Sequence, residues 1–258
     1  MLAPPPTEMD SPFNFLGYGF LLIILIFLLL NLDRRFRDYM QRALVRPYNF
    51  FADIRDQRII PNAQTGLLLI AESGALLLVL GGLLYSFRSD TTARFFVEHF
   101  FPWSWVQNLL WDLSRDPLML CFLGTLIIAG LLVAIALVVR FAAVFVKGRI
   151  YLSDTINVVV WSALPLIFLL PFGMIITRLD RNETLGLTAM WVLVVLFGWI
   201  FYRLLKGVAV LFDIYPTRVY LYAGIATAIL LVATVLHMDY HHDWLKHLET
   251  FRGMLRDS

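Results

Sequence analysis

The sequence predicts an all-α fold: a polytopic transmembrane helical bundle of six spans with additional helices at the membrane surface. Hydrophobic residues make up 60% of the 258 residues and charged residues only 16%, whereas soluble domains carry about 25% charged residues. Six separate runs each supply the roughly 20 apolar residues that a helix needs to cross a bilayer. These runs are Phe13–Leu32, Gly66–Phe87, Leu118–Val146, Thr155–Thr177, Leu187–Leu205 and Arg218–Leu236.

The first run is predicted to be a retained anchor rather than a cleaved signal peptide. The residues before it carry two acids and no basic residue, and the run lacks a small-residue cleavage site. We therefore divide the chain into four parts. Residues 1–32 form an outside N-terminus and anchor span, 33–65 a cytoplasmic arginine-rich elbow, 66–237 a five-span membrane domain, and 238–258 an outside amphipathic tail.

The elbow contains a charged, aromatic segment from Arg46 to Arg58. Pro47 suits the first turn of a helix, because its missing N–H has no helical partner there. Such a helix places Phe50, Phe51 and Ile54 on one face, so we expect it to lie along the bilayer surface. An ordinary juxtamembrane loop is the alternative. The candidate residues of this interfacial elbow are Arg46, Pro47, Phe50, Phe51, Asp53, Arg55 and Arg58.

Basic residues are distributed unevenly among the segments that join the runs. Loops 33–65, 140–154 and 203–218 hold 13 of them, whereas the remaining loops and the two ends hold 8. The positive-inside rule then puts both termini outside and the elbow in the cytoplasm. On the outer side, three tryptophans between residues 100 and 111 indicate a re-entrant or surface helix at the level of the headgroups.

Glu72 is the most informative single residue, because it lies about two turns into the second run, where a charge is costly. Arg140 is expected at a similar depth near the cytoplasmic end of the third run. We predict an ion pair between these two residues on neighbouring helices. The alternative is that Arg140 extends to the membrane surface and Glu72 is protonated or bound to a hydroxyl group.

The fourth run is interrupted by Pro165 and Pro171, which free backbone carbonyls and kink the helix. In a transporter such a break lines a binding site, and in a structural membrane protein it shapes the bundle. No matching broken helix occurs elsewhere in the sequence, which favours the second interpretation.

Little in the sequence indicates catalysis or cofactor binding. His237 and His241, four residues apart, are weak candidates for metal ligands, but an amphipathic surface helix accounts for the same tail. Cys121 is the only cysteine, so no disulfide can form within one chain. No nucleophile and base are arranged in a recognisable motif, and the net charge of +2 gives no reason to expect nucleic acid. We expect no enzymatic activity and no cofactor.

Three segments carry a resemblance to a known family: Leu44–Arg58, Asp154–Pro171 with Trp161-Ser162-Ala163-Leu164-Pro165, and Trp191–Leu205. Together they resemble the Yip family, five-span membrane proteins named for interaction with Ypt/Rab GTPases, over residues 44–237. The resemblance implies that the N-terminal side of the family's five-span core lies in the cytoplasm. This agrees with the charge distribution, which places the elbow there. The chain adds a span before this core and lacks the long polar N-terminal region of eukaryotic members, so a bacterial-type member is expected.

These observations predict a non-catalytic scaffold or accessory subunit of a larger membrane protein assembly, in a bacterial inner membrane. Its expected partners are membrane lipids and other integral membrane proteins, with a homo-oligomer left open. The alternative is a transport component that uses Glu72 as a proton or cation site. A membrane-embedded metal enzyme that uses the histidine tail is the weakest of the three classes.

Overall fold

The computed structural model describes residues 13–58, 62–86, 103–145, 150–179 and 183–242, and this part of the chain contains helices and no strands. Six spans are long and apolar enough to cross a membrane, which confirms the predicted fold class. Five of them consist of the helices α1 (Phe13–Leu32), α4 (Asn62–Ser86), α7 (Pro117–Ala142), α10 (Glu183–Phe212) and α11 (Pro216–His242). The remaining span consists of α8 (Leu152–Ala163), the 3-10 helix η3 (Leu164–Leu169) and α9 (Leu170–Leu179).

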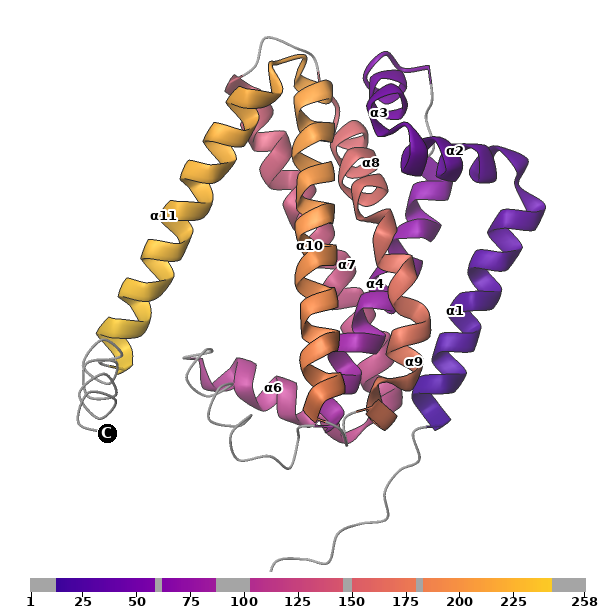
Figure 1. Ribbon diagram of the computed structural model, residues 1–258, viewed down its shortest axis with the longest axis vertical. Helices are drawn as coiled ribbons and strands as arrows, with labels where there is room; N and C mark the ends of the chain where they lie inside the picture. The colour runs from indigo at the N-terminus through magenta and orange to yellow at the C-terminus, as the bar shows by residue number, and fades with distance from the viewer. Residues whose placement is uncertain (1–12, 59–61, 87–102, 146–149, 180–182, 243–258) are drawn as a thin grey trace, which may run out of the picture.

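Shorter helices lie at the two ends of the bundle (Figure 1). At one end, α2 (Arg34–Val45) runs across the bundle and α3 (Pro47–Arg55) follows it. At the other end lies α6 (Ser104–Arg115), and a short 3-10 helix, η2 (Ala143–Phe145), extends α7. In Figure 1, α1 begins and α11 ends at the end of the bundle that is opposite the elbow helices α2 and α3.

Local sequence signals account for several helix boundaries. Asp33 and Asp116 precede α2 and α7, and each side chain accepts a hydrogen bond from the first turn of its helix. Pro47, Pro117 and Pro216 stand at the starts of α3, α7 and α11, where a proline loses no helical hydrogen bond. These signals separate helices that follow one another without long connections.

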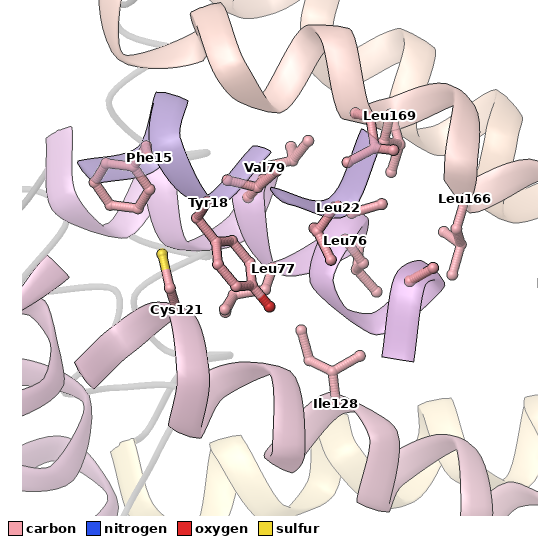
Figure 2. Close-up of a cluster of buried hydrophobic side chains, with 14 of the residues drawn as sticks. Phe15, Tyr18, Leu22, Leu76, Leu77, Val79, Cys121, Ile128, Leu166 and Leu169 are labelled. Carbon is pink, nitrogen blue, oxygen red and sulfur yellow. The ribbon is translucent and has the colours of Figure 1, made fainter. Parts of the chain in front are cut away.

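The interior has two hydrophobic clusters, one toward each end of the bundle. Figure 2 shows the first, in which side chains of α1, α4, α7 and the η3 segment meet. In this cluster Tyr18 and Thr125 are joined by a hydrogen bond of 2.7 Å between their hydroxyl groups. The second cluster lies between the elbow helices and the bundle. It includes Phe36 of α2, Phe51 of α3 and Trp161 of α8. Helix α4 contributes to both clusters and is therefore the central helix of the bundle.

Helix α11 stands apart from the other spans. Only 6% of the span Pro216–His237 is buried, against 67% for Asn62–Tyr85 in α4. Figure 1 shows α11 leaning away from α10 toward its C-terminal end. Its apolar side chains, including Ile225 and Leu230, are exposed, as expected of a span that faces lipid.

Close contact between α4 and α9 depends on Gly173. A Cβ atom at this position would lie 2.5 Å from the Leu78 Cβ and 3.1 Å from the Leu78 backbone carbon, so α4 itself would have to move. Gly198 on α10 has no atom within 4 Å of the corresponding position.

We predict that Gly173→Ala destabilises the protein by about 1 to 3 kcal/mol, the usual cost of overpacking. The matched control Gly198→Ala should be neutral or stabilising by up to about 1 kcal/mol, because alanine favours the helix. Thermal unfolding of both variants in detergent, followed by circular dichroism, tests the difference. Equal unfolding temperatures for the two variants would contradict the close packing of α4 on α9.

Candidate functional site

The break in the fourth span exposes backbone carbonyls that a regular helix would satisfy. Pro165 has no N–H, so the Trp161 carbonyl four residues earlier has no helical donor. The chain then continues as the 3-10 helix η3, which is a tighter helix than α8. At Pro171 the corresponding carbonyl, that of Ile167, instead accepts a local bond from the Leu170 N–H. The carbonyl freed by Pro165 therefore needs a hydrogen-bond donor from another helix, and the carbonyl freed by Pro171 does not.

Arg203 on α10 is that partner. Its Nη2 donates to the Trp161 carbonyl at 3.0 Å and its Nε to the Ser162 carbonyl at 3.2 Å. The same Nη2 donates to the Ala43 carbonyl at 3.1 Å, near the C-terminal end of α2. Although charged, Arg203 is only 3% exposed. One guanidinium thus joins α10, the break in the fourth span and the elbow.

This role of Arg203 was not predicted from the sequence, because the fifth apolar run was predicted to end at Leu205 and the following loop to include Arg203. The structure continues α10 to Phe212, so Arg203 lies about 14 Å inside the elbow end of the helix at 1.5 Å per residue. The available signal was the apolar run Val208–Phe212, which follows Arg203 and Lys206. It places Arg203 within the span and not beyond it.

Glu72 lies at a comparable depth on α4, about 15 Å from Asn62, the first residue of the helix. It is fully buried, and within the described residues neither carboxylate oxygen has a hydrogen-bond partner. The charged group that acts on it electrostatically is Arg203. The Oγ atoms of Ser73 and Ser162 are also buried and have no hydrogen-bond partner within the described residues.

The structure does not bring Glu72 and Arg140 together. Among the described residues no ion pair or hydrogen bond joins them, and Arg140 lies only two residues from the end of α7. This position is about 3 Å from the helix end, whereas Glu72 is about 15 Å deep. Of the two arginines, Arg203 is therefore the one whose depth in the bundle is similar to that of Glu72.

A polar network holds the first half of the fourth span against α4. The Thr65 hydroxyl donates to Asn157 Oδ1 at 2.6 Å, and the Trp161 Nε1 donates to the Thr65 hydroxyl at 2.8 Å. Asn157 Nδ2 in turn donates to Asn62 Oδ1 at 3.2 Å. These buried groups satisfy one another, as polar groups in an apolar interior must. The network fixes the position of Trp161 and hence of the carbonyls that follow it.

The elbow packs its apolar face on the bundle and not on lipid. Phe50 and Phe51 on α3 are fully buried, and the Phe50 ring lies 4.9 Å from the Trp161 ring, centroid to centroid. Phe36 of α2 is also fully buried, 5.9 Å from Trp161. The sequence pattern is the same for a helix on the bilayer surface and for a helix on protein, so it does not distinguish the two. The structure covers this apolar face with α8 and α10.

Polar contacts also join the elbow to the bundle. Gln57 donates to Asp154 Oδ1 at 3.0 Å, at the start of α8. Arg55 forms an ion pair of 2.7 Å with Asp213, at the end of α10. Asp33 accepts a hydrogen bond from Gln64, and this bond is the main reason why the pKa of the Asp33 carboxyl lies below its ordinary value. The elbow is therefore attached to α4, α8 and α10.

The other predicted elbow residues are partly or fully exposed. Pro47 begins α3, and Asp53 forms ion pairs with Arg42 and, at 3.8 Å, with Arg58. Arg46 is exposed. Within the elbow, four exposed arginines form no ion pair with any described residue, and they are Arg34, Arg35, Arg37 and Arg46. The outer surface of the elbow thus carries uncompensated positive charge.

A pocket of about 370 Å³ lies where α3 meets the turn between α10 and α11. It is lined by the Arg55–Asp213 ion pair, by the tyrosines Tyr48 and Tyr215, and by apolar residues at the end of α10. Asp213 has a left-handed backbone, with φ of 52°, which ends α10 and starts the turn. Both tyrosines are exposed, so the pocket opens at the surface of the elbow end.

The described residues include no group of three or more side chains that could hold a metal ion. His237 is exposed near the C-terminal end of α11, and the side chain of His241 lies outside the described residues. Of the predicted tail over 238–258, residues 243–258 lie outside the described residues as well. Chemically, the junction of Glu72, Arg203 and the fourth-span break is a charged polar site in an apolar bundle.

A family model described as Yip1 domain covers residues 42–237, which is more than half of the chain. This range includes the elbow helix α3, the broken fourth span and Arg203, and it leaves out α1. No curated protein and no solved structure matches the chain.

Proposed function

The chain belongs to the Yip1 domain family, and on that premise we propose that it is a non-catalytic integral membrane scaffold or accessory subunit of a larger membrane protein assembly. The family and the six apolar spans establish an integral membrane protein. A non-catalytic role agrees with the site described above, where the buried polar groups bind helices to one another.

The main support for this proposal is the firm attachment of the elbow to the bundle. A scaffold needs a surface that keeps its shape, and here the buried side of the elbow is attached to the bundle by aromatic packing on Trp161, by the Arg203 bond to Ala43 and by the Arg55–Asp213 ion pair. Its outer side presents exposed arginines and the pocket beside Tyr48. Such a rigid, charged surface suits the recognition of acidic groups on a partner.

We propose other integral membrane proteins as the partners, with membrane lipids around the spans and a homo-oligomer as the remaining possibility. The long exposed apolar faces of α7 and α11 offer area for contacts within the bilayer. Exposed arginines at the elbow suit acidic segments of a partner at the membrane surface.

For the location we propose a bacterial inner membrane with both termini outside the cytoplasm. The excess of basic residues on the elbow side supports this orientation. The arrangement in Figure 1, with α1 beginning and α11 ending at the end opposite the elbow, agrees with it.

A transport component that uses Glu72 is the second candidate, and one observation favours it. Glu72 is a fully buried carboxylate without a hydrogen-bond partner among the described residues, as expected of a group that takes up a proton or cation. The positive charge of Arg203 acts against the binding of a proton and of any other cation alike, so it does not distinguish between these two ligands.

Purification of the tagged full chain in mild detergent, followed by mass spectrometry of bound proteins, tests the scaffold proposal. We expect partners in stoichiometric amounts, and we expect the triple variant Arg34→Glu, Arg35→Glu, Arg37→Glu to lose at least nine tenths of them. The control Arg115→Glu reverses an exposed charge on α6, at the other end of the bundle, and should retain the partners. A monomer or homodimer alone, with proton uptake in liposomes that Glu72→Gln abolishes, would support transport instead.

A further inference from the structure

The pocket between α3 and the turn that joins α10 to α11 is lined by charges of both signs. We infer that it binds a zwitterionic lipid headgroup in which a phosphodiester is joined to a primary ammonium, as in phosphatidylethanolamine. The inference goes beyond the scaffold proposal, which gives this pocket no ligand. It rests on the position of the pocket, on the balance of its charges and on its unused hydrogen-bonding groups.

The pocket lies at the level of the membrane surface. Its lining includes Asp213 and Tyr215, which belong to the short turn between the spans Trp191–Phe212 and Pro216–His237. Each of these spans has 22 residues, about 33 Å of helix, so a bilayer core about 30 Å thick ends close to the turn. Tyrosine is enriched at this level, and both Tyr48 and Tyr215 line the pocket. A ligand in the pocket therefore lies among lipid headgroups.

Exposed apolar side chains lie on both helices that meet at the pocket. They include Leu221 and Ile225 on α11 and Phe201 on α10. The two helices lean apart away from the turn that joins them (Figure 1). A lipid whose headgroup occupies the pocket can place its acyl chains against these helices, whereas a soluble ligand makes no use of them.

The lining of the pocket has no excess of either charge. Arg55 and Asp213 form the ion pair that lines it. Two neighbours add one charge of each sign, since Asp56 pairs with Arg55 and the Arg218 guanidinium lies 5.9 Å from the Tyr215 ring. An anionic lipid would need a surplus of positive charge, whereas a zwitterion can place its phosphate beside Arg55 and its cation beside Asp213. The last turn of α10 also favours a cation here, because the C-terminal end of a helix dipole is negative.

Both charged side chains keep hydrogen-bonding groups for a ligand. Arg55 donates through Nε to Asp56 and through Nη1 to Asp213, and its Nη2 has no hydrogen-bond partner among the described residues. A guanidinium is well suited to phosphate oxygens. Asp213 accepts through Oδ1 alone, and its side chain is 83% exposed, so Oδ2 is open to a donor. A primary ammonium offers three N–H donors and a trimethylammonium none, which favours the primary ammonium at this carboxylate.

Native mass spectrometry of the full chain in detergent tests the site. The chain is mixed with equal amounts of phosphatidylethanolamine, phosphatidylcholine and phosphatidylglycerol that carry the same acyl chains. We expect phosphatidylethanolamine to be retained at least about fivefold more than either other lipid, the ratio that one additional hydrogen bond gives. Retention of phosphatidylcholine or phosphatidylglycerol at the same level would overturn the inference. No partner protein is present, so this result is independent of the scaffold proposal.

Glycerophosphoethanolamine, which has the same headgroup but no acyl chains, distinguishes a lipid from a soluble ligand. We expect the chain not to retain it at the concentration at which it retains the lipid. Equal retention would assign the pocket to a soluble phosphate ester and overturn the lipid assignment.

Asp213→Asn assigns the selectivity to the pocket. Asparagine tolerates the left-handed backbone at this position, where φ is 52°, so the variant removes the charge and keeps the turn. We expect the preference for phosphatidylethanolamine over phosphatidylcholine to disappear. The control Asp112→Asn makes the same change at an exposed position on α6, at the other end of the bundle, and should keep the preference. An unchanged preference in Asp213→Asn, with circular dichroism showing that both variants are folded, would overturn the inference.

Discussion

Arg203→Gln is expected to lower the free energy of unfolding by about 3 to 5 kcal/mol, because most of the hydrogen bonds of the guanidinium are lost and each hydrogen bond to a charged group is worth about 1.5 to 3 kcal/mol. The carbonyls of Ala43, Trp161 and Ser162 accept these hydrogen bonds and lose their donor. Glutamine has one amide group in place of the guanidinium and is shorter, so it cannot reach all three oxygens.

Thermal unfolding in detergent, followed by circular dichroism, measures this effect. The control Arg218→Gln removes an exposed arginine whose guanidinium lies 5.9 Å from the Tyr215 ring, and should change stability by no more than about 0.5 kcal/mol. Arg203→Lys keeps the charge but loses the planar fork, so it should fall between the parent and Arg203→Gln. If Arg203→Gln is as stable as Arg218→Gln, the role assigned to Arg203 is wrong.

The second large effect is expected for Trp161→Ala. Trp161 is fully buried beneath the elbow, where it contacts the rings of Phe36, Tyr39 and Phe50. Truncating a buried tryptophan to alanine costs about 3 to 5 kcal/mol, because the apolar contacts are lost and a cavity remains. The elbow loses its central aromatic contact, so we also expect the segment around α3 to be cut faster by protease.

Trp161→Phe separates packing from hydrogen bonding. It keeps a ring in the cluster but removes the Nε1–H that donates to Thr65, and the expected loss is about 1 kcal/mol, the usual worth of one hydrogen bond. Circular dichroism measures the stability of each variant. Limited proteolysis shows whether the elbow is still attached to the bundle. Destabilisation by Trp161→Ala without faster cleavage would mean that the elbow is held by its other contacts.

The sequence predicted the spans well because their signal is local. A run of about 20 apolar residues is stable in few environments other than a membrane. Pro47 as a helix start and the breaks at Pro165 and Pro171 are local signals of the same kind. The amphipathic pattern of Phe50, Phe51 and Ile54 likewise identified the face of α3 that becomes buried.

The features that could not be predicted are those that depend on which helices are in contact. Periodicity shows that a face is apolar but not whether protein or lipid covers it, so the packing of α3 on α8 and α10 was beyond the sequence. The partner of Glu72 depends on the order of the helices in the bundle. Arg140 and Arg203 are both single basic residues near the end of an apolar run, and only the fold brings Arg203 to the break.

A distance measurement tests whether Arg203 and the Trp161 cluster hold the elbow in one position on the bundle. Spin labels attached through Gln41→Cys on α2 and Thr217→Cys at the start of α11 are exposed, whereas the native Cys121 is buried. The distance distribution between the labels, measured by pulsed electron paramagnetic resonance in nanodiscs, should be narrow in the parent. It should broaden in Arg203→Gln. A distribution that is already broad in the parent, or that stays narrow in Arg203→Gln, would contradict the claim.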